Sequence, residues 1–451
     1  MRYKIIIFII FIHSLLLGQS LFNRFVGTDP FIGSARSTAM GKTHLLNSTG
    51  STNVRFNPAN LGMIQSRLGI SLQMNRSSVF ERWSIPIKDF FGKYFTYADY
   101  VANEFNYYAF SGGIYWTPII GNLGSSLSFG FNYSPLTHFN YEYLEEVRGD
   151  YDTATEENEY ANKDPLIGYQ NLTTDGTLML SSIGCGYNIN ITNNIDIKIG
   201  ASMHQINSSE ISDKTNIDTL KLYDTYGYPS YSDIANLSDY PDVHQTAKIS
   251  KSHFISWSTQ LTINSNSKIG VSWEGEANSK TKVWDAVIDL NSGLYMYWDS
   301  STFEDSVYYA QNGINYIKPE MRTLAFNYTA DADHGISLSF EMNQVFYNEH
   351  LYLNDYKKFK FGFEYITQLG TPIRGGLIYR QATILPMKPI SIFTFGTGKS
   401  IGNLIVDVAG TYCFQSFYYF DLFPVENEVK LYLDRVRDSQ LNLMLALTYQ
   451  F

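Results

Sequence analysis

The residues best suited to catalysis or metal binding in this sequence are its histidines, and their spacing fits neither role. A metal site takes its ligands from clustered positions, as in the paired ligands of zinc sites. The histidines after residue 20 are scattered instead, at His44, His138, His204, His244, His253, His334 and His350. No phosphate-binding loop is present either. We therefore predict that the protein is not an enzyme and has no catalytic residue, no metal site and no cofactor.

Charged side chains offer a different chemistry, because many of them recur at alternate positions of otherwise apolar segments. Period two places such residues on one face of a β-strand. We assign ten of them to an enclosed inner face: Asp196, Lys198, Glu274, Glu341, Lys358, Lys360, Glu364, Arg374, Arg380 and Asp407. Because both signs occur, charge-assisted pairing in a filled interior is favoured over a wide channel of one charge. Ion pairs that only hold the interior together are the plainer alternative.

The elements that must position these residues are β-strands. The last of them alternates Leu441, Leu443, Leu445 and Leu447 with polar or small residues. Fourteen segments have strand character: 67–77, 108–117, 124–134, 177–189, 193–207, 253–264, 267–276, 321–330, 335–345, 358–367, 373–383, 389–398, 402–413 and 439–451. The sequence thus predicts an all-β protein of about fourteen strands.

The lengths of the connections distinguish a membrane barrel from a soluble sandwich. Every even-numbered connection between these segments is short, and all the long connections are odd-numbered. Outer-membrane barrels have short periplasmic turns, long extracellular loops and an even number of strands. A sandwich has no reason to place its long loops at one end. We therefore expect a transmembrane antiparallel β-barrel, in contact with outer-membrane lipid.

The N-terminus has the features of a secretory signal peptide. Arg2 and Lys4 precede an apolar run from Ile5 to Leu17, and small residues follow it. That run is shorter than the roughly 20 residues that cross a bilayer as a helix. We predict a signal peptide over residues 1–20, a leading segment over 21–63, and a barrel over 64–451. Export would take the chain to the outer membrane of a Gram-negative bacterium.

Composition agrees with a wall that meets lipid on alternate residues. Aromatic residues make up 16 % of the chain and charged residues only 17 %, against about 25 % charged in soluble domains. The net charge of −10 argues against nucleic acid as a partner, because phosphate neutralisation needs clustered Lys and Arg. Cys185 and Cys413 lie far apart within predicted strands, so we expect two free thiols.

The leading segment carries a recognisable pair of motifs. Residues 33–41 read GSARSTAMG, and residues 57–61 read NPANL. This pair resembles the FadL-like outer-membrane proteins, particularly the branch that contains PorV and PorQ. The stretches 371–380 and 393–398 look like late strands of that family, and residues 81–87 look like a first-loop element of PorV-like relatives. The resemblance covers both ends of the chain.

This resemblance implies a barrel of fourteen strands with an N-terminal plug or hatch folded inside it. The plug residues would be Arg36, Met40, Gly41, Asn57, Pro58 and Ala59. The Asn57–Ala59 turn would either rearrange to open a route or serve as a rigid turn that leads into the first strand. Arg36 would either anchor the plug to an inward carboxylate or remain exposed.

Two functions from different classes follow from the resemblance. The first is passive uptake of hydrophobic small molecules across the outer membrane. The alternative is a PorV-like scaffold that binds secreted or surface proteins for type IX secretion. A third possibility stays open, because some barrels are hydrolases: His204 and His253, both expected to face inward, would then need a serine within hydrogen-bond reach.

Overall fold

The computed structural model describes most of the chain after the predicted signal peptide. The described residues are 21, 27–28, 33–63, 67–120, 125–148, 166–192, 194–219, 243–288, 316–330, 335–348, 353–383, 388–419, 421–423 and 433–451. The predicted signal peptide, His334 and His350 lie outside these ranges.

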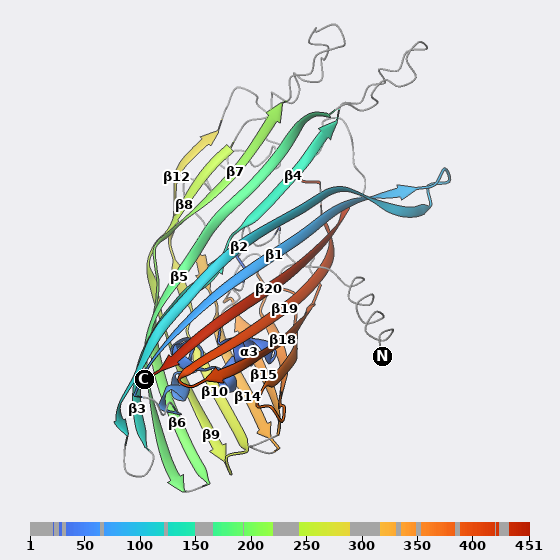
Figure 1. Ribbon diagram of the computed structural model, residues 1–451. Helices are drawn as coiled ribbons and strands as arrows, with labels where there is room; N and C mark the ends of the chain where they lie inside the picture. The colour runs from blue at the N-terminus through green and yellow to red at the C-terminus, as the bar shows by residue number, and fades with distance from the viewer. Residues whose placement is uncertain are drawn as a thin grey trace, which may run out of the picture.

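Antiparallel strands form nearly all of the described structure (Figure 1). They are β1 (Leu68–Lys88), β2 (Tyr94–Ile120), β3 (Ser126–His138), β4 (Tyr141–Arg148), β5 (Leu166–Thr192), β6 (Ile195–Ile206), β7 (Ser209–Thr219), β8 (Val243–Ile249), β9 (Ser252–Ile263) and β10 (Ser267–Glu274). The remainder are β11 (Ala277–Ser279), β12 (Thr281–Ile288), β13 (Tyr316–Lys318), β14 (Glu320–Thr329), β15 (Ile336–Phe346), β16 (Tyr356–Ile366), β17 (Pro372–Arg380), β18 (Ile390–Ile401), β19 (Leu404–Tyr419) and β20 (Asp434–Gln450).

These strands close into a barrel. Some barrel strands are interrupted and carry two labels. Counted without these interruptions, the described strands form a barrel wall of 14 antiparallel strands. The wall closes where β1 pairs with β20, from Gly69 opposite Gln450 to Ser84 opposite Arg435. Within the barrel, closure between β1 and β20 pairs the two outermost described strands with each other, and an open edge in hydrocarbon would cost several kcal/mol for each unsatisfied backbone group.

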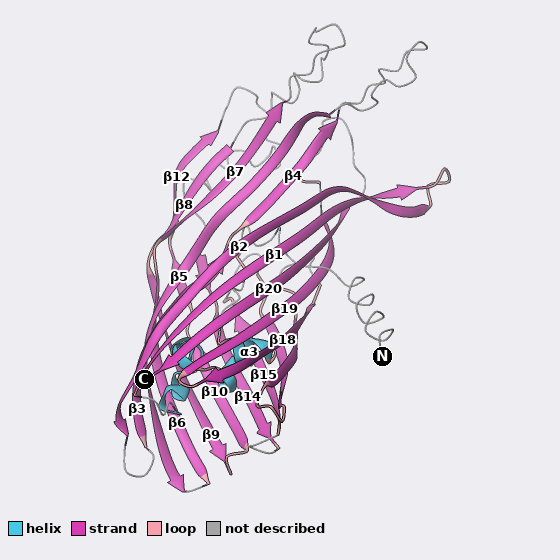
Figure 2. Ribbon diagram, viewed as in Figure 1, coloured by secondary structure: helices cyan, strands magenta, loops and turns pink. Residues whose placement is uncertain are grey.

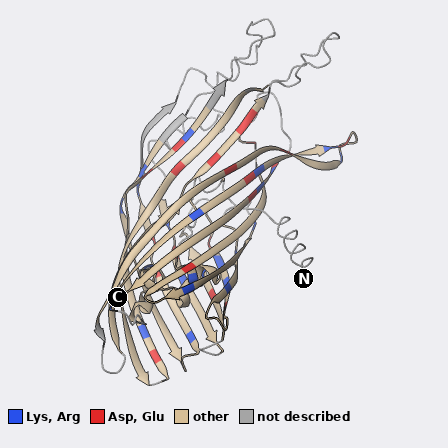
Figure 3. Ribbon diagram, in the orientation of Figure 1, with Lys and Arg blue, Asp and Glu red and all other residues tan. Residues whose placement is uncertain are grey.

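The two faces of the wall differ in the way that the sequence predicts. On β20, Leu443, Leu445 and Leu447 are 38–44 % exposed on the outer face, whereas Met444 and Ala446 are buried inside. β20 from Leu441 onward and the whole of β3 carry no charged residue (Figure 3). An apolar outer face on a closed barrel is the arrangement required by lipid. The predicted fold, a transmembrane antiparallel barrel of about fourteen strands, is confirmed.

The strands are longer than the sequence predicts, and this corrects the boundaries of the loops. Residues 78–107, predicted as a long connection, form a hairpin in which β1 and β2 pair up to Lys88 and Tyr94. β4, β7, β8 and β12 likewise extend the wall through segments predicted as loops. Beyond the lipid, backbone pairing continues but the outer face need not be apolar. The alternation that marked the strands therefore fades before the strands end.

Five short helices among the described residues lie inside the lower part of the barrel, near the short turns (Figure 2). They are α3 (Ala35–Ala39), α4 (His44–Asn47), η1 (Gly50–Thr52), α5 (Asn53–Phe56) and η2 (Pro58–Met63). Among the described helices, none is both long enough and apolar enough to cross a membrane.

The outer apolar face generates a prediction about Leu445. A Leu445→Arg substitution places a charge on the lipid-facing wall, and we expect it to destabilise the barrel by about 2–4 kcal/mol. Ala102→Arg is the control, since Ala102 is exposed on β2 beyond the apolar stretch. Denaturant titration in lipid vesicles measures both. Equal losses of stability in the two variants would contradict the assignment of the lipid-facing surface.

Candidate functional site

The candidate site is the interface between the N-terminal segment and the inner wall. The helices of this segment contact β5, β6, β9 and β10 on one side of the barrel and β17, β18 and β19 on the other. Nearly all of residues 33–61 are buried. The segment therefore packs inside the barrel between opposite parts of its wall, and we call residues 33–63 the plug.

The Met40-Gly41 motif rests on a pair of glycines in the wall. Gly362 on β16 lies directly opposite Gly376 on β17. A Cβ at Gly376 would overlap the backbone nitrogen of Gly41, and one at Gly362 would overlap the carbonyl of Met40. Gly41 itself has a φ of +69°, which favours glycine. The plug backbone thus packs directly against the wall backbone, and this contact explains all three glycines.

The Asn57-Pro58-Ala59 motif rests on a second glycine pair across the barrel. Gly186 on β5 lies opposite Gly200 on β6, and a Cβ on either would overlap Pro58 or Ala59. Hydrogen bonds fix the same turn, because Ser258 Oγ donates to Asn57 Oδ1 at 2.7 Å and accepts from the Ala59 amide at 2.9 Å. Asn57 also donates to the carbonyl of Leu45. The turn is held from two sides in this state.

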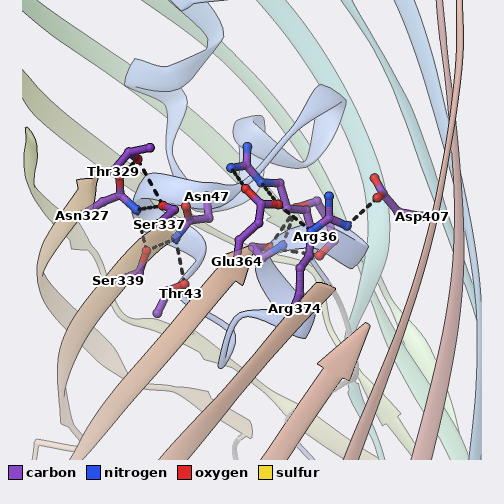
Figure 4. Close-up of polar contacts among 12 residues, drawn as sticks. Arg36, Thr43, Asn47, Asn327, Thr329, Ser337, Ser339, Glu364, Arg374 and Asp407 are labelled. Atoms are coloured by element: carbon purple, nitrogen blue, oxygen red, sulfur yellow. Dashed lines mark hydrogen bonds and ion pairs between the residues drawn. The ribbon is translucent and has the colours of Figure 1, made fainter. Parts of the chain in front are cut away.

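Arg36 joins the plug to the wall through a chain of four charges (Figure 4). Its Nε and Nη2 donate to the two oxygens of Glu364 at 3.1 and 2.6 Å. Glu364 also accepts from Arg374 Nε at 2.6 Å, and Arg374 Nη1 donates to Asp407 at 2.6 Å. Two arginines and two carboxylates neutralise one another, which offsets the cost of burying Glu364, Arg374 and Asp407.

Glu341 supplies a second link between plug and wall. One oxygen accepts from the backbone amide of Leu45 in α4 at 2.8 Å, and the other accepts from Lys360 Nζ at 2.6 Å. Beside it, Asn47 Nδ2 donates to Ser339 Oγ at 2.8 Å (Figure 4). A carboxylate that bonds a helix N–H and a lysine at once satisfies both groups without water.

Glu274 forms a third link, with partners that sequence reasoning missed. Its oxygens lie 2.8 Å from Arg55 Nη1 and 2.7 Å from Lys318 Nζ, and all three side chains are at most 7 % exposed. Both cations also lie near the Phe254 ring, with Lys318 Nζ 4.3 Å from its centroid. Arg55 lies outside both motifs, and Lys318 lies on a strand that was predicted as loop, so neither gave a signal.

The other four charged residues assigned to the lumen lie elsewhere on the wall. Lys198 is buried and donates to Thr262 Oγ1 at 3.3 Å. Asp196 is half-buried two residues before it on β6. Lys358 and Arg380 are half-buried and opposite each other on β16 and β17. The sequence therefore assigned these ten residues to one face but could not tell which of them contact the plug.

Of the two histidines considered for catalysis, only His204 faces inward. His253 is exposed on the opposite face of β9 from Phe254, so its predicted inward position is wrong. His204 contacts Ser182 Oγ at 2.7 Å and Ser256 Oγ at 2.8 Å and is fully buried against Phe254. Each ring nitrogen thus meets a hydroxyl and neither meets a carboxylate that would orient a base. This geometry fits a hydrogen-bonded interior histidine.

Three other chemical features can be placed in the described part of the chain. Residues 398–402 match the Gly-x-Ser-x-Gly pattern of hydrolases. They occupy the last residues of β18 and the start of the turn that leads to β19, whereas a nucleophile elbow joins a strand to a helix. No group of three or more His, Cys, Asp or Glu among the described residues is placed to hold a metal. Cys185 and Cys413 are both free thiols, as predicted.

An aromatic cluster lines the interior beyond the plug, toward the long connections. Trp83 packs edge-on against Tyr143 with ring centroids 5.5 Å apart, and Tyr143 stacks on Phe423 at 5.8 Å. We call these buried residues the inner aromatic cluster: Leu21, Val79, Trp83, Val101, Phe105, Tyr107, Tyr141, Tyr143, Leu172, Phe417, Phe423 and Val436. The interior is therefore ionic at the plug, and beyond it the aromatic and aliphatic cluster lies beside the buried carboxylates Glu81, Asp434 and Asp438.

A closed barrel with an apolar outer face and an N-terminal segment packed inside defines a plugged transmembrane β-barrel. Its fold is similar to that of a Pseudomonas aeruginosa FadL homologue, with 14 % identity and a TM-score of 0.56 over 94 % of this chain and 100 % of that one. It is also similar to the toluene transporter TodX of P. putida, with 11 % identity and a TM-score of 0.52 over 92 % and 98 %. No protein-family model and no curated protein matches the chain. The likeness is one of fold.

The glycine pair beneath Met40 and Gly41 gives a testable prediction. Gly376→Ala should force the plug backbone away from the wall, at a cost of about 1–3 kcal/mol. Gly375→Ala is the matched control, because its Cβ would overlap the Phe363 ring and not the plug backbone. Hydrogen exchange of residues 35–47 reports the effect. Unchanged exchange in Gly376→Ala would show that the contact does not hold the plug.

Glu274 gives a second prediction at this site. Glu274→Gln leaves Arg55 and Lys318 buried without their common anion, and breaking such a pair costs about 3–5 kcal/mol. Glu276→Gln, two residues along and exposed, serves as the control. The unfolding midpoint in denaturant, measured in detergent micelles, should fall for the first variant only. If the Glu274→Gln protein is as stable as the control, the Glu274–Arg55–Lys318 cluster does not anchor the plug.

Proposed function

We propose that this barrel lies in the outer membrane of a Gram-negative bacterium and takes up hydrophobic small molecules passively, without a catalytic step. The observation that carries the proposal is the inner aromatic cluster, which an apolar molecule arriving from the long-loop side would meet before the plug. Tyr141 and Tyr143 offer rigid apolar surfaces with polar tips, and such residues suit small apolar ligands. The likeness in fold to a FadL homologue and to a toluene transporter supports the same proposal.

The interior of the barrel also indicates which kind of solute it suits. At the plug, the wall and the helices are joined by buried ion pairs and by direct backbone packing at the glycine pairs. Water-filled channels of the porin type instead have an open polar lumen. A solute that partitions into the aromatic cluster is therefore favoured over a hydrated ion or sugar.

The test is binding and uptake by the purified barrel in liposomes, with toluene and a long-chain fatty acid as probes. Tyr143→Asp places a carboxylate in the aromatic cluster and should weaken binding at least about tenfold, equivalent to about 1.4 kcal/mol. Leu144→Asp is the matched control, because Leu144 is 51 % exposed on the outer face of β4. If the unaltered barrel neither binds nor passes either probe, the proposal fails.

A second candidate is a scaffold of the PorV-like kind that holds secreted or surface proteins. The observation in its favour is the plug itself, which is anchored to strands on both sides of the barrel. Reversible crosslinking in native membranes, followed by purification of the tagged barrel, should then recover type IX secretion components. If the barrel is purified without other proteins while its uptake activity is intact, the scaffold function is rejected.

A further inference from the structure

The most exposed apolar group on the described surface is at the far end of the β1–β2 hairpin. Phe90 is 99 % exposed, Phe91 83 %, Tyr94 58 % and Phe95 75 %. We call these four residues the aromatic tip. Lys88 precedes the tip and Lys93 lies between Phe91 and Tyr94, so the two lysines flank the Phe90–Phe91 pair. Large apolar groups gathered in water mark interaction sites, and aromatic residues dominate the energetics of protein interfaces.

The turn that carries the tip is preorganised. Asp89 Oδ1 accepts from the backbone amides of Phe91 at 3.0 Å and Lys93 at 2.7 Å. The Asp89 amide donates to the Lys93 carbonyl at 2.7 Å, and Gly92 supplies a φ of +74°. Binding would therefore cost little ordering of the backbone.

The stem of the hairpin is fastened to the wall at a fixed place. Tyr97 and Tyr418 share a hydrogen bond of 3.0 Å between their hydroxyls, and the Arg435 guanidinium lies 4.9 Å from the Tyr97 ring. Asp99 binds Arg437 of β20 and accepts from Ser84 Oγ at 2.7 Å. Beyond this point the hairpin leaves the barrel sideways (Figure 1).

The tip is out of reach of the hydrocarbon. On β1 the exposed apolar alternation runs from Leu68 to Met74, and Arg76 bonded to Asn106 follows it. From Met74 to Ser84, where the hairpin leaves the wall, the strand advances about 3.3 Å per residue, or about 33 Å. At a tilt of about 45° this places the base of the projecting hairpin about 20 Å above the apolar band. The hairpin then turns sideways and not back toward the apolar band.

We propose that the aromatic tip is a docking finger for a second protein that stands beside the barrel on the long-loop side. The partner would present an apolar cleft for Phe90 and Phe91 and an acidic rim for the flanking lysines. Complementary charge at such a rim would guide association, while the buried aromatic rings would supply most of the affinity. The finger is separate from the plug and the inner aromatic cluster, so this role does not depend on uptake.

Photo-crosslinking in intact cells of the source bacterium tests the proposal with the full-length chain. Phe90→p-benzoylphenylalanine and Phe91→p-benzoylphenylalanine should give the same discrete adduct with one other protein. Ala102→p-benzoylphenylalanine, exposed on the stem, should not give it. Heat-modifiable migration on gels verifies that each variant is a folded barrel.

Charge reversal tests the chemistry assigned to the partner. Adding Lys88→Glu and Lys93→Glu to the Phe90 probe variant should lower the adduct at least about tenfold, as expected for loss of complementary charge. Lys88→Arg with Lys93→Arg should retain it. Uptake by the barrel should be unchanged in both. Adducts only with lipid or lipopolysaccharide, only with a second copy of this chain, or equally from Ala102 would each overturn the proposal, as would no adduct at all.

Discussion

The need to pair every backbone hydrogen bond within hydrocarbon governs the whole molecule. A sheet in lipid cannot keep a free edge, so β1 must meet β20 and the strands must curve into a closed wall. Closure then divides the side chains into two sets with different solvents. Lipid selects the leucines and phenylalanines of the outer face, and the enclosed volume has to be filled by something else. The polar inner face and the plug are both consequences of that one constraint.

The way the volume is filled depends on how closely two backbones can approach. At Gly186 with Gly200, and again at Gly362 with Gly376, the wall offers no side chains and the plug motifs lie directly on it. Close packing of this kind excludes water, so the charges nearby must satisfy one another. Glu274, Glu341 and Glu364 each contact at least one cation and also a group from the plug. The plug and the inner charges thus form one structure.

Outside the bilayer the same strands extend the wall and carry other surfaces. The ladder continues far past the apolar band, since water tolerates a paired strand of any composition. This extension carries the inner aromatic cluster on its inner face and the aromatic tip at the end of one hairpin. Two apolar surfaces, one enclosed and one projecting, therefore stand on the same extended wall.

The sequence by itself determined the features that repeat along the chain. Alternation in segments such as Ile336–Met342 identified the strands, and the rhythm of short and long connections identified a barrel, because both depend only on neighbours in sequence. The same parity placed Glu364 and Arg374 on one face. Tertiary structure alone decided which of the inward-facing carboxylates contact Arg36 or Arg55. Those contacts depend on how the plug lies across strands that are distant in sequence. It also decided that residues 78–107 are a paired hairpin and not a loop. Their pairing in water needs no apolar alternation, so the sequence carried no signal for it.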